Sequence, residues 1–338
     1  MTEHRLRFGI IGAGRIAQTW AAALSASGLA QLTAVVDVDP AAACALAERH
    51  GGRACDSYRA LAQGEVDAVV VCTPPVSHAE IVRDVADRSV HVLCEKPFAL
   101  GSREAGEMLR AGQRGRALIA MSTKFRFADG VAATRRLLDD GVLGDVESVE
   151  IAFNSHVDMR GSWYADARLS GGGVLMDNGP HALDLMRCVL GPLVAVRADE
   201  EGRPQGLAVE ETVRLETRNG AGTNGTIYLS WSDARPRPDF LVVRGSRGTA
   251  RVGWQATCVD IAGRSEVIAG GYDKLGVFRA HAVNFCRAAA SLESLRAGGE
   301  EALATVDLLE AAYASLRDGE WREAGGGYRP ALAPGRHA

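Results

Sequence analysis

Three short motifs contain residue types that could carry chemistry. Gly12-Ala13-Gly14-Arg15-Ile16-Ala17 is a GxGxxA pattern, which follows an apolar run and opens an Ala-rich segment. Glu95-Lys96-Pro97 ends another apolar run, and Asp177 stands four residues before His181 in a glycine-rich stretch. The first pattern is typical of phosphate binding at a helix N-terminus. Lysine, carboxylate and histidine side chains transfer protons and stabilise developing charge.

The glycine motif predicts a dinucleotide-binding turn in a first strand–helix–strand unit. Gly12 permits the tight turn, Gly14 lets the backbone approach a pyrophosphate, and Ala17 keeps the helix close to the strand. Asp37 follows Gly14 by 23 residues and ends the next apolar run, where a carboxylate accepts hydrogen bonds from ribose hydroxyls. Because Asp37 would repel a 2′-phosphate, the sequence favours NAD over NADP. A methyltransferase would use a similar turn and acid, and these residues alone do not exclude it.

Lys96 follows the predicted strand 90–94 directly. In open α/β sheets, ligands bind at the carboxyl ends of the strands. The chain has three lysines, Lys96, Lys124 and Lys274, against 35 arginines, so a lysine at such an end is notable. A tight corner can also select the cis form of Pro97.

On a helix, Asp177 and His181 would share one face about a turn apart. Gly179-Pro180 stands between them, so we expect the helix to begin here. The glycines at 171–173 permit close approach of a ligand or of another strand. No third ligand accompanies the pair, and therefore no metal site is predicted.

Apolar runs alternate with helical patterns over the first third of the chain. Such strands are typical of a parallel sheet that helices cover on both faces. The predicted strands are 6–11, 32–36, 66–72, 90–94 and 117–121, and the predicted helices are 16–27, 41–49, 78–86 and 103–111. Ser77, with Glu80 three residues later, predicts a capping box for the third helix.

The pattern changes near residue 124. Alternation at Val149, Ile151 and Phe153 predicts a strand with one buried face, and similar segments follow. The further predicted strands are 213–217, 226–231, 240–243 and 249–252, the hairpin turns 219–220 and 245–248, and the helices 131–138, 278–291 and 302–316. The sequence thus predicts an α/β protein with a Rossmann domain (1–123), an α+β domain with a mostly antiparallel sheet (124–325) and a loose tail (326–338).

Composition excludes several classes of protein. With 38 basic and 42 acidic residues the formal charge is −4, which argues against a nucleic-acid binder. The chain is 47% hydrophobic and 24% charged, unlike a disordered chain. We expect no membrane span and no signal peptide, and hence a cytoplasmic protein. The seven cysteines, without a CxxC pair, are expected to be reduced thiols.

Together the three motifs resemble the Gfo/Idh/MocA family, the relatives of glucose–fructose oxidoreductase and inositol dehydrogenase. They occur in the family's order and at its approximate spacing, and the likeness runs from residue 6 to about 317. The resemblance implies a second domain with a large open sheet that often forms the subunit interface, and hence a homodimer or homotetramer. It also implies a nicotinamide cofactor and a sugar or cyclitol as the substrate.

The resemblance further implies roles for individual residues. Lys96, Asp177 and His181 would form the catalytic cluster. The cofactor would contact residues of both N-terminal motifs and of the segment between them: Gly12, Gly14, Arg15, Ile16, Asp37, Thr73, Pro74, His78, Glu95 and Lys96. The candidates for substrate contact are Asn154, His156, Trp163 and Arg168.

The expected reaction is reversible hydride transfer between nicotinamide and a secondary alcohol or ketone of a sugar or cyclitol. His181 would exchange the proton, Asp177 would hold the imidazole ring of His181, and a cationic Lys96 would stabilise the alkoxide. The alternative that Lys96 is the proton donor is left open. Alternatives are a nucleotide-sugar ketoreductase, an enzyme that retains its cofactor between two substrates, and a cofactor-sensing regulator. A methyltransferase leaves Lys96, Asp177 and His181 unexplained.

Overall fold

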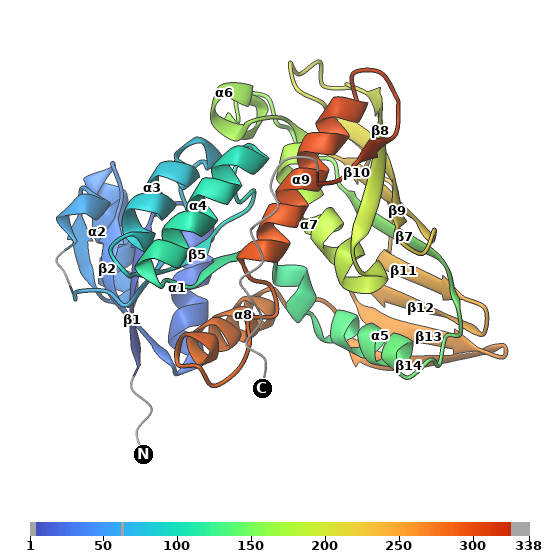
Figure 1. Cartoon of the computed structure of the whole chain (residues 1–338), viewed down its shortest axis with the longest axis horizontal. Coiled ribbons are helices and arrows are strands. Elements are labelled where there is room, and N and C mark those ends of the chain that lie inside the picture. The colour runs from blue at the N-terminus through green and yellow to red at the C-terminus, as the bar shows by residue number, and fades with distance from the viewer. Residues whose placement is uncertain (1–4, 62–63, 326–338) are drawn as a thin grey trace.

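Two sheets with helices packed around them make up residues 5–61 and 64–325, the part of the chain that this computed structural model describes (Figure 1). The predicted tail, 326–338, lies outside the described residues. Within the described ranges, no helix has the length and apolar character needed to cross a membrane.

The first sheet is parallel throughout, with the strand order β3-β2-β1-β4-β5-β6. Its strands are β1 (Leu6–Ile11), β2 (Ala30–Val36), β3 (Arg53–Cys55), β4 (Ala68–Val71), β5 (His91–Cys94) and β6 (Ile119–Met121). The order reverses between β1 and β4, so a crevice for a dinucleotide opens at the carboxyl ends of these strands. The predicted Rossmann domain is confirmed.

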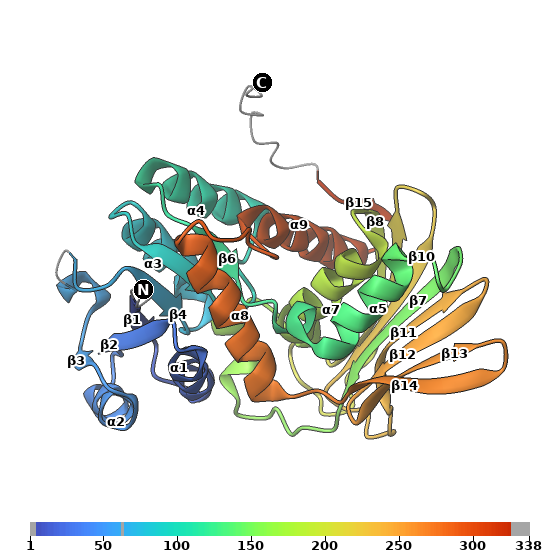
Figure 2. The same cartoon turned by 90° about the horizontal axis from the view of Figure 1, so that it is seen from below.

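Helices cover both faces of this sheet, which explains why its strands are apolar throughout. They are α1 (Arg15–Ser27), α2 (Pro40–His50), α3 (His78–Ala86) and α4 (Ser102–Gly115). Figure 2 shows α1 and α2 on one face and α3 and α4 on the other. Every residue of β4 is buried, as expected for a central strand.

The second sheet is mixed and mostly antiparallel, with the order β14-β13-β12-β11-β7-β10-β9-β8-β15. Its strands are β7 (Val146–Asn154), β8 (Leu193–Gly202), β9 (Thr212–Asn219), β10 (Asn224–Ser230), β11 (Asp239–Gly245), β12 (Gly248–Gly253), β13 (Ala256–Ile261), β14 (Arg264–Gly270) and β15 (Arg322–Glu323). Only β7 and β10 pair in parallel among these strands of the described chain. Both predicted hairpins, β9–β10 and β11–β12, are present.

The helices of the second half lie on one face of this sheet and against the Rossmann domain (Figures 1 and 2). They are α5 (Asp129–Asp139), α6 (Ala167–Ser170), α7 (Val174–Leu190), α8 (Lys274–Ala289) and α9 (Gly299–Ser315). In Figure 2, none of the described helices covers the opposite face of the sheet. Helix α8 packs on α1, where the rings of Trp20 and Phe278 meet edge to face at 4.7 Å.

Two local predictions were wrong. Helix α7 begins at Val174, before Asp177, and continues through Pro180, because the glycine-rich loop supplies its N-terminus. The Ser77 side chain does not cap α3. Its hydroxyl instead lies 2.8 Å from Thr73 Oγ1 and 2.9 Å from the Pro74 carbonyl oxygen, and thus stabilises the loop after β4.

Candidate active site

A cleft of about 510 Å³ lies at the carboxyl ends of β1, β2 and β4. Gly12 has φ +94°, and a Cβ there would lie 2.8 Å from the Cys72 main chain, so the turn requires glycine. A Cβ on Gly14 would have no atom within 4 Å, so its backbone faces open space at the start of α1. This cradle fits a pyrophosphate, which the free N–H groups of the helix N-terminus would bind.

Most of the predicted cofactor residues line this cleft: Gly12, Gly14, Arg15, Ile16, Asp37, Thr73 and Pro74. Asp37 accepts hydrogen bonds from the backbone N–H groups of Ala13 (2.6 Å) and Asp39 (2.9 Å). These bonds fix the carboxylate at the end of β2. It is therefore placed for the ribose of an adenosine bound in the cleft.

The corner after β5 is held by two buried side chains. Glu95 accepts a hydrogen bond from the Trp20 indole at 2.7 Å, and the Lys96–Pro97 peptide bond is cis. His78 is completely buried, with its ring nitrogens 2.9 Å from the carbonyl oxygens of Thr73 and Pro97. His78 therefore differs from its expected role: it joins the loop after β4 to the corner after β5 and does not line the cleft.

Lys96 and Asp177 bring the two domains together in a second cavity of about 190 Å³. The Lys96 ammonium donates to the Asp177 carboxylate at 2.5 Å and to its carbonyl oxygen at 2.9 Å. Trp231 donates to the other carboxylate oxygen at 3.2 Å. Burial alone would lower the pKa of Lys96, but the Asp177 carboxylate raises it, so the ammonium stays charged.

His181 lines the same cavity and is 6% exposed. Burial lowers the pKa of His181 well below its usual range, and the charges of Lys124 and Lys96 lower it further. The imidazole is therefore neutral at pH 7. The sequence suggested that Asp177 holds this ring. Instead, the hydrogen bonds of the Asp177 carboxylate to other described side chains go to Lys96 and Trp231.

The two cavities adjoin, because Ile16, Cys72, Thr73, Trp163 and Tyr164 line both of them. A dinucleotide in the first cavity would thus extend toward the Lys96–Asp177–His181 cluster in the second. Glu95 lines the second cavity as well.

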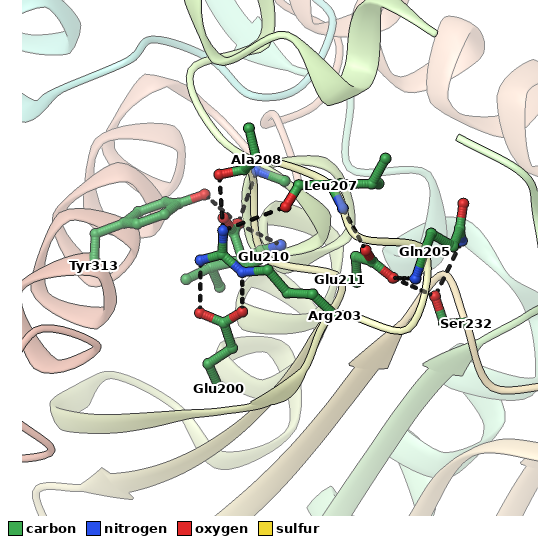
Figure 3. Close-up of polar contacts among 11 residues, drawn as sticks. Glu200, Arg203, Gln205, Leu207, Ala208, Glu210, Glu211, Ser232 and Tyr313 are labelled. Carbon is green, nitrogen blue, oxygen red and sulfur yellow. Dashed lines mark hydrogen bonds and ion pairs between the residues drawn. The ribbon is translucent and has the colours of Figure 1, made fainter. Parts of the chain in front are cut away.

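The glycine-rich loop brings α7 close to the segment before β9, where Figure 3 shows Tyr313 of α9 pointing toward Glu210. A Cβ on Gly173 would lie 2.1 Å from the Glu210 carbonyl oxygen, so the close approach suggested by the glycines is to this segment. The Glu210 carboxylate accepts hydrogen bonds from the N–H groups of Gly173 (2.8 Å) and Leu175 (3.2 Å) and from the Tyr313 hydroxyl (2.7 Å). It therefore anchors the N-terminus of the helix that carries Asp177 and His181.

Three of the four predicted substrate residues lie elsewhere. Asn154 donates to the backbone of Asp233 and Arg235, and His156 is exposed in a bridge with Ser232. The Arg168 side chain is 89% exposed and pairs with Asp166. Asn154 follows buried Phe153 in β7, so it points to the opposite face of the sheet. Trp163 does line both cavities.

Sequence reasoning missed Lys124, Trp231, Tyr164 and Glu210. Lys124 could have been found, since it follows β6 at the same edge of the sheet as Lys96. The other three reach the site from segments whose position depends on the tertiary fold.

Comparison with known proteins identifies the family. Residues 6–122 match the model described as the oxidoreductase family with an NAD-binding Rossmann fold, and residues 131–251 match the GFO/IDH/MocA C-terminal domain. The chain belongs to the Gfo/Idh/MocA oxidoreductase family. The predicted NAD cofactor is thereby confirmed.

Individual relatives of this Gfo/Idh/MocA chain differ in the compounds that they are named for. It is 35% identical over 188 residues to inositol 2-dehydrogenase of Rhizobium meliloti, a match that spans 55% of each chain. Levoglucosan dehydrogenase, solved with NADH and levoglucosan, has a TM-score of 0.88 at 19% identity, covering 95% of this chain and all of that one. WlbA dehydrogenase of Bordetella pertussis, solved with NADH and UDP-GlcNAcA, has a TM-score of 0.83 at 24% identity, covering 96% and 99%.

Proposed function

We propose that this protein is an NAD-dependent oxidoreductase acting on a secondary alcohol or ketone of a sugar or cyclitol. One observation carries the proposal: Lys96, Asp177 and His181 line one cavity that adjoins the dinucleotide cleft. The names of the relatives, which include inositol and levoglucosan dehydrogenases, support the substrate class. A second copy packed on the open face of the second sheet would give the homo-oligomer that we propose.

Lys96, Asp177 and His181 would each have a separate role in the reaction. The nicotinamide, when bound, supplies the hydride acceptor or donor. Neutral His181 would take the hydroxyl proton of the substrate, because it is unprotonated at pH 7. The Lys96 ammonium would stabilise negative charge on the same oxygen, and Asp177 would fix its position. This division favours His181 over Lys96 as the proton acceptor in oxidation.

The test is replacement of Lys96. In the Lys96→Met variant we expect turnover to fall by about 10²- to 10³-fold, the usual effect of removing one charge-stabilising donor. Turnover would be followed as NADH formation from NAD with a panel of cyclitols, free sugars and UDP-sugars. NADH binding, measured by fluorescence, should persist.

Arg103→Met is the matched control, because Arg103 lies in the same domain with an 82% exposed side chain. It should leave turnover unchanged. Near-normal turnover in Lys96→Met would remove this lysine from the mechanism. NADH binding without turnover of any panel member by the unmodified protein would contradict the enzyme proposal and favour a cofactor sensor.

A further inference from the structure

Two of the chain's three lysines line one cavity, and the third lies on a helix that contributes to its wall, although arginine outnumbers lysine 35 to three. Lys96 and Lys124 line it, from the ends of neighbouring strands β5 and β6. Lys274 is exposed at the start of α8, one turn before Phe278, which also lines the cavity. The charge of Lys274 acts on Lys124, since it contributes to lowering the pKa of Lys124.

Both carboxylates of the cavity already have other partners. Asp177 binds the Lys96 ammonium and the Trp231 indole. Glu95 accepts hydrogen bonds from the Trp20 indole at 2.7 Å and the Lys96 backbone N–H at 3.2 Å. The charges of both acids raise the pKa of Lys124, but neither carboxylate forms a hydrogen bond or ion pair with it in the described part of the chain.

Lys124 forms no hydrogen bond or ion pair with any residue in the described ranges. Its ammonium lies 5.2 Å from the centre of the Phe125 ring and 6.0 Å from that of Phe278. Burial, together with Lys96, lowers the pKa of Lys124 to about 8, which still leaves it mostly charged at pH 7. His181 is neutral and cannot balance this charge.

An ammonium that is partly withdrawn from water without a carboxylate partner is costly, unless an anion joins it. We propose that Lys124, assisted by Lys274, is an anion subsite, so that the substrate is a sugar or cyclitol bearing a carboxylate or a phosphate. The subsite rests on the proposed function, because it deepens the specificity of the same cavity. A compact ammonium on a flexible stem suits either group as a point charge.

Binding to the NADH-loaded protein tests this subsite. We would measure Kd by calorimetry for D-glucuronate, D-glucose 6-phosphate and D-glucose, which share a ring and differ in charge. We expect one of the two anions to bind at least about 10-fold more tightly than glucose, because a charge-assisted hydrogen bond contributes about this much to affinity. Preference for glucuronate assigns a carboxylate, and preference for glucose 6-phosphate assigns a phosphate.

Lys124→Met should abolish this preference while keeping the thermal unfolding of the protein cooperative. Lys274→Met, at an exposed position, should partially weaken the preference for the anion over glucose. This variant provides the test if Lys124→Met does not fold. Arg136→Met removes an exposed charge of α5 and should retain the preference in full. Equal affinity for all three sugars, absence of binding by both anions, or an unchanged preference in Lys124→Met would overturn the subsite.

The result is separable from that of the proposed function. Anion preference without NADH formation by any compound would retain the subsite and reject the oxidoreductase. NADH formation from neutral sugars or cyclitols, with no anion preference, would retain the oxidoreductase and reject the subsite.

Discussion

The carboxylate of Asp37 has two tasks at the end of β2. It accepts hydrogen bonds from the backbone N–H groups of Ala13 and Asp39, and it lines the cleft where a ribose would bind. The first task shapes the phosphate-binding turn. The second would distinguish NAD from NADP, since a carboxylate accepts a hydrogen bond from a 2′-hydroxyl and repels a 2′-phosphate.

Replacing Asp37 should therefore narrow the preference for NAD. In Asp37→Ser we expect the KM for NAD to rise about 10- to 100-fold, the effect of losing hydrogen bonds to a charged group, with a smaller change for NADP. Steady-state kinetics with both cofactors would measure this. Asp39→Asn is the control, because it retains the side-chain oxygen that caps α2 and should keep the preference. An unaltered NAD-to-NADP ratio in Asp37→Ser would refute the ribose assignment.

Helix α7 places two of the three catalytic candidates, so whatever anchors its first turn also sets their geometry. Glu210 is 6% exposed and accepts from Gly173, Leu175 and the Tyr313 hydroxyl of α9. Its negative charge at the helix N-terminus also complements the helix dipole. Glu210 is therefore a positioning residue, acting on Asp177 through the helix.

We expect Glu210→Gln to lower the free energy of unfolding by about 1–3 kcal/mol, because a charged acceptor is lost at a buried helix end. It should also lower kcat more than it raises KM, since the Lys96–Asp177 contact would shift while the pocket remains. Denaturant titration and steady-state kinetics would measure both. Tyr313→Phe removes one of the three donors and should have the smaller effect. A loss of stability without any change in kcat would make Glu210 purely structural.

Sequence patterns predicted elements better than they predicted which way side chains point. The Rossmann strands were predictable because burial on both faces makes them continuously apolar, as in β4. Strands β3, β8, β13, β14 and β15 were missed; β14, for example, lies at one edge of its sheet and has mostly exposed residues. The buried alternation through Phe153 predicted β7, and it already implied that Asn154 faces away from α7. Motif residues near the cleft were predictable, whereas Glu210 and Trp231 required the tertiary fold.

The geometry of the candidate catalytic cluster depends on how the two domains are joined. Lys96 comes from the first sheet, and Asp177 and His181 come from a helix that packs on the second. Three buried histidines lie at or near this junction. His78 braces the corner beside Lys96, His181 lines the cavity, and His281 of α8 stacks on Phe127 with the ring centres 4.3 Å apart.

These histidines should make the whole fold sensitive to mild acid. Burial lowers the pKa of His78, lowers that of His181 strongly, and lowers that of His281 to about 3. Each histidine would bind a proton below about pH 6.5 in the unfolded chain, but in the folded chain it would bind one only at a lower pH. The unfolded state then holds more protons, so stability is present above pH 6.5 and falls as the pH decreases below it.

Below pH 6.5, each buried histidine should lower the free energy of unfolding by about 1.4 kcal/mol per pH unit, until the histidine in the folded chain also binds a proton. Urea unfolding at pH 7 and pH 5 would measure the difference, in a window where ordinary carboxylates stay ionised in both states. In His281→Asn, one fewer proton should bind on unfolding. The free energy of unfolding should therefore fall less steeply between pH 7 and pH 5, whatever the stability of the variant at pH 7. His156→Gln, at an exposed position, should retain the full dependence. If His281→Asn loses stability between pH 7 and pH 5 as steeply as the unmodified protein, His281 does not contribute, and the acid sensitivity must come from the other buried histidines or from other groups.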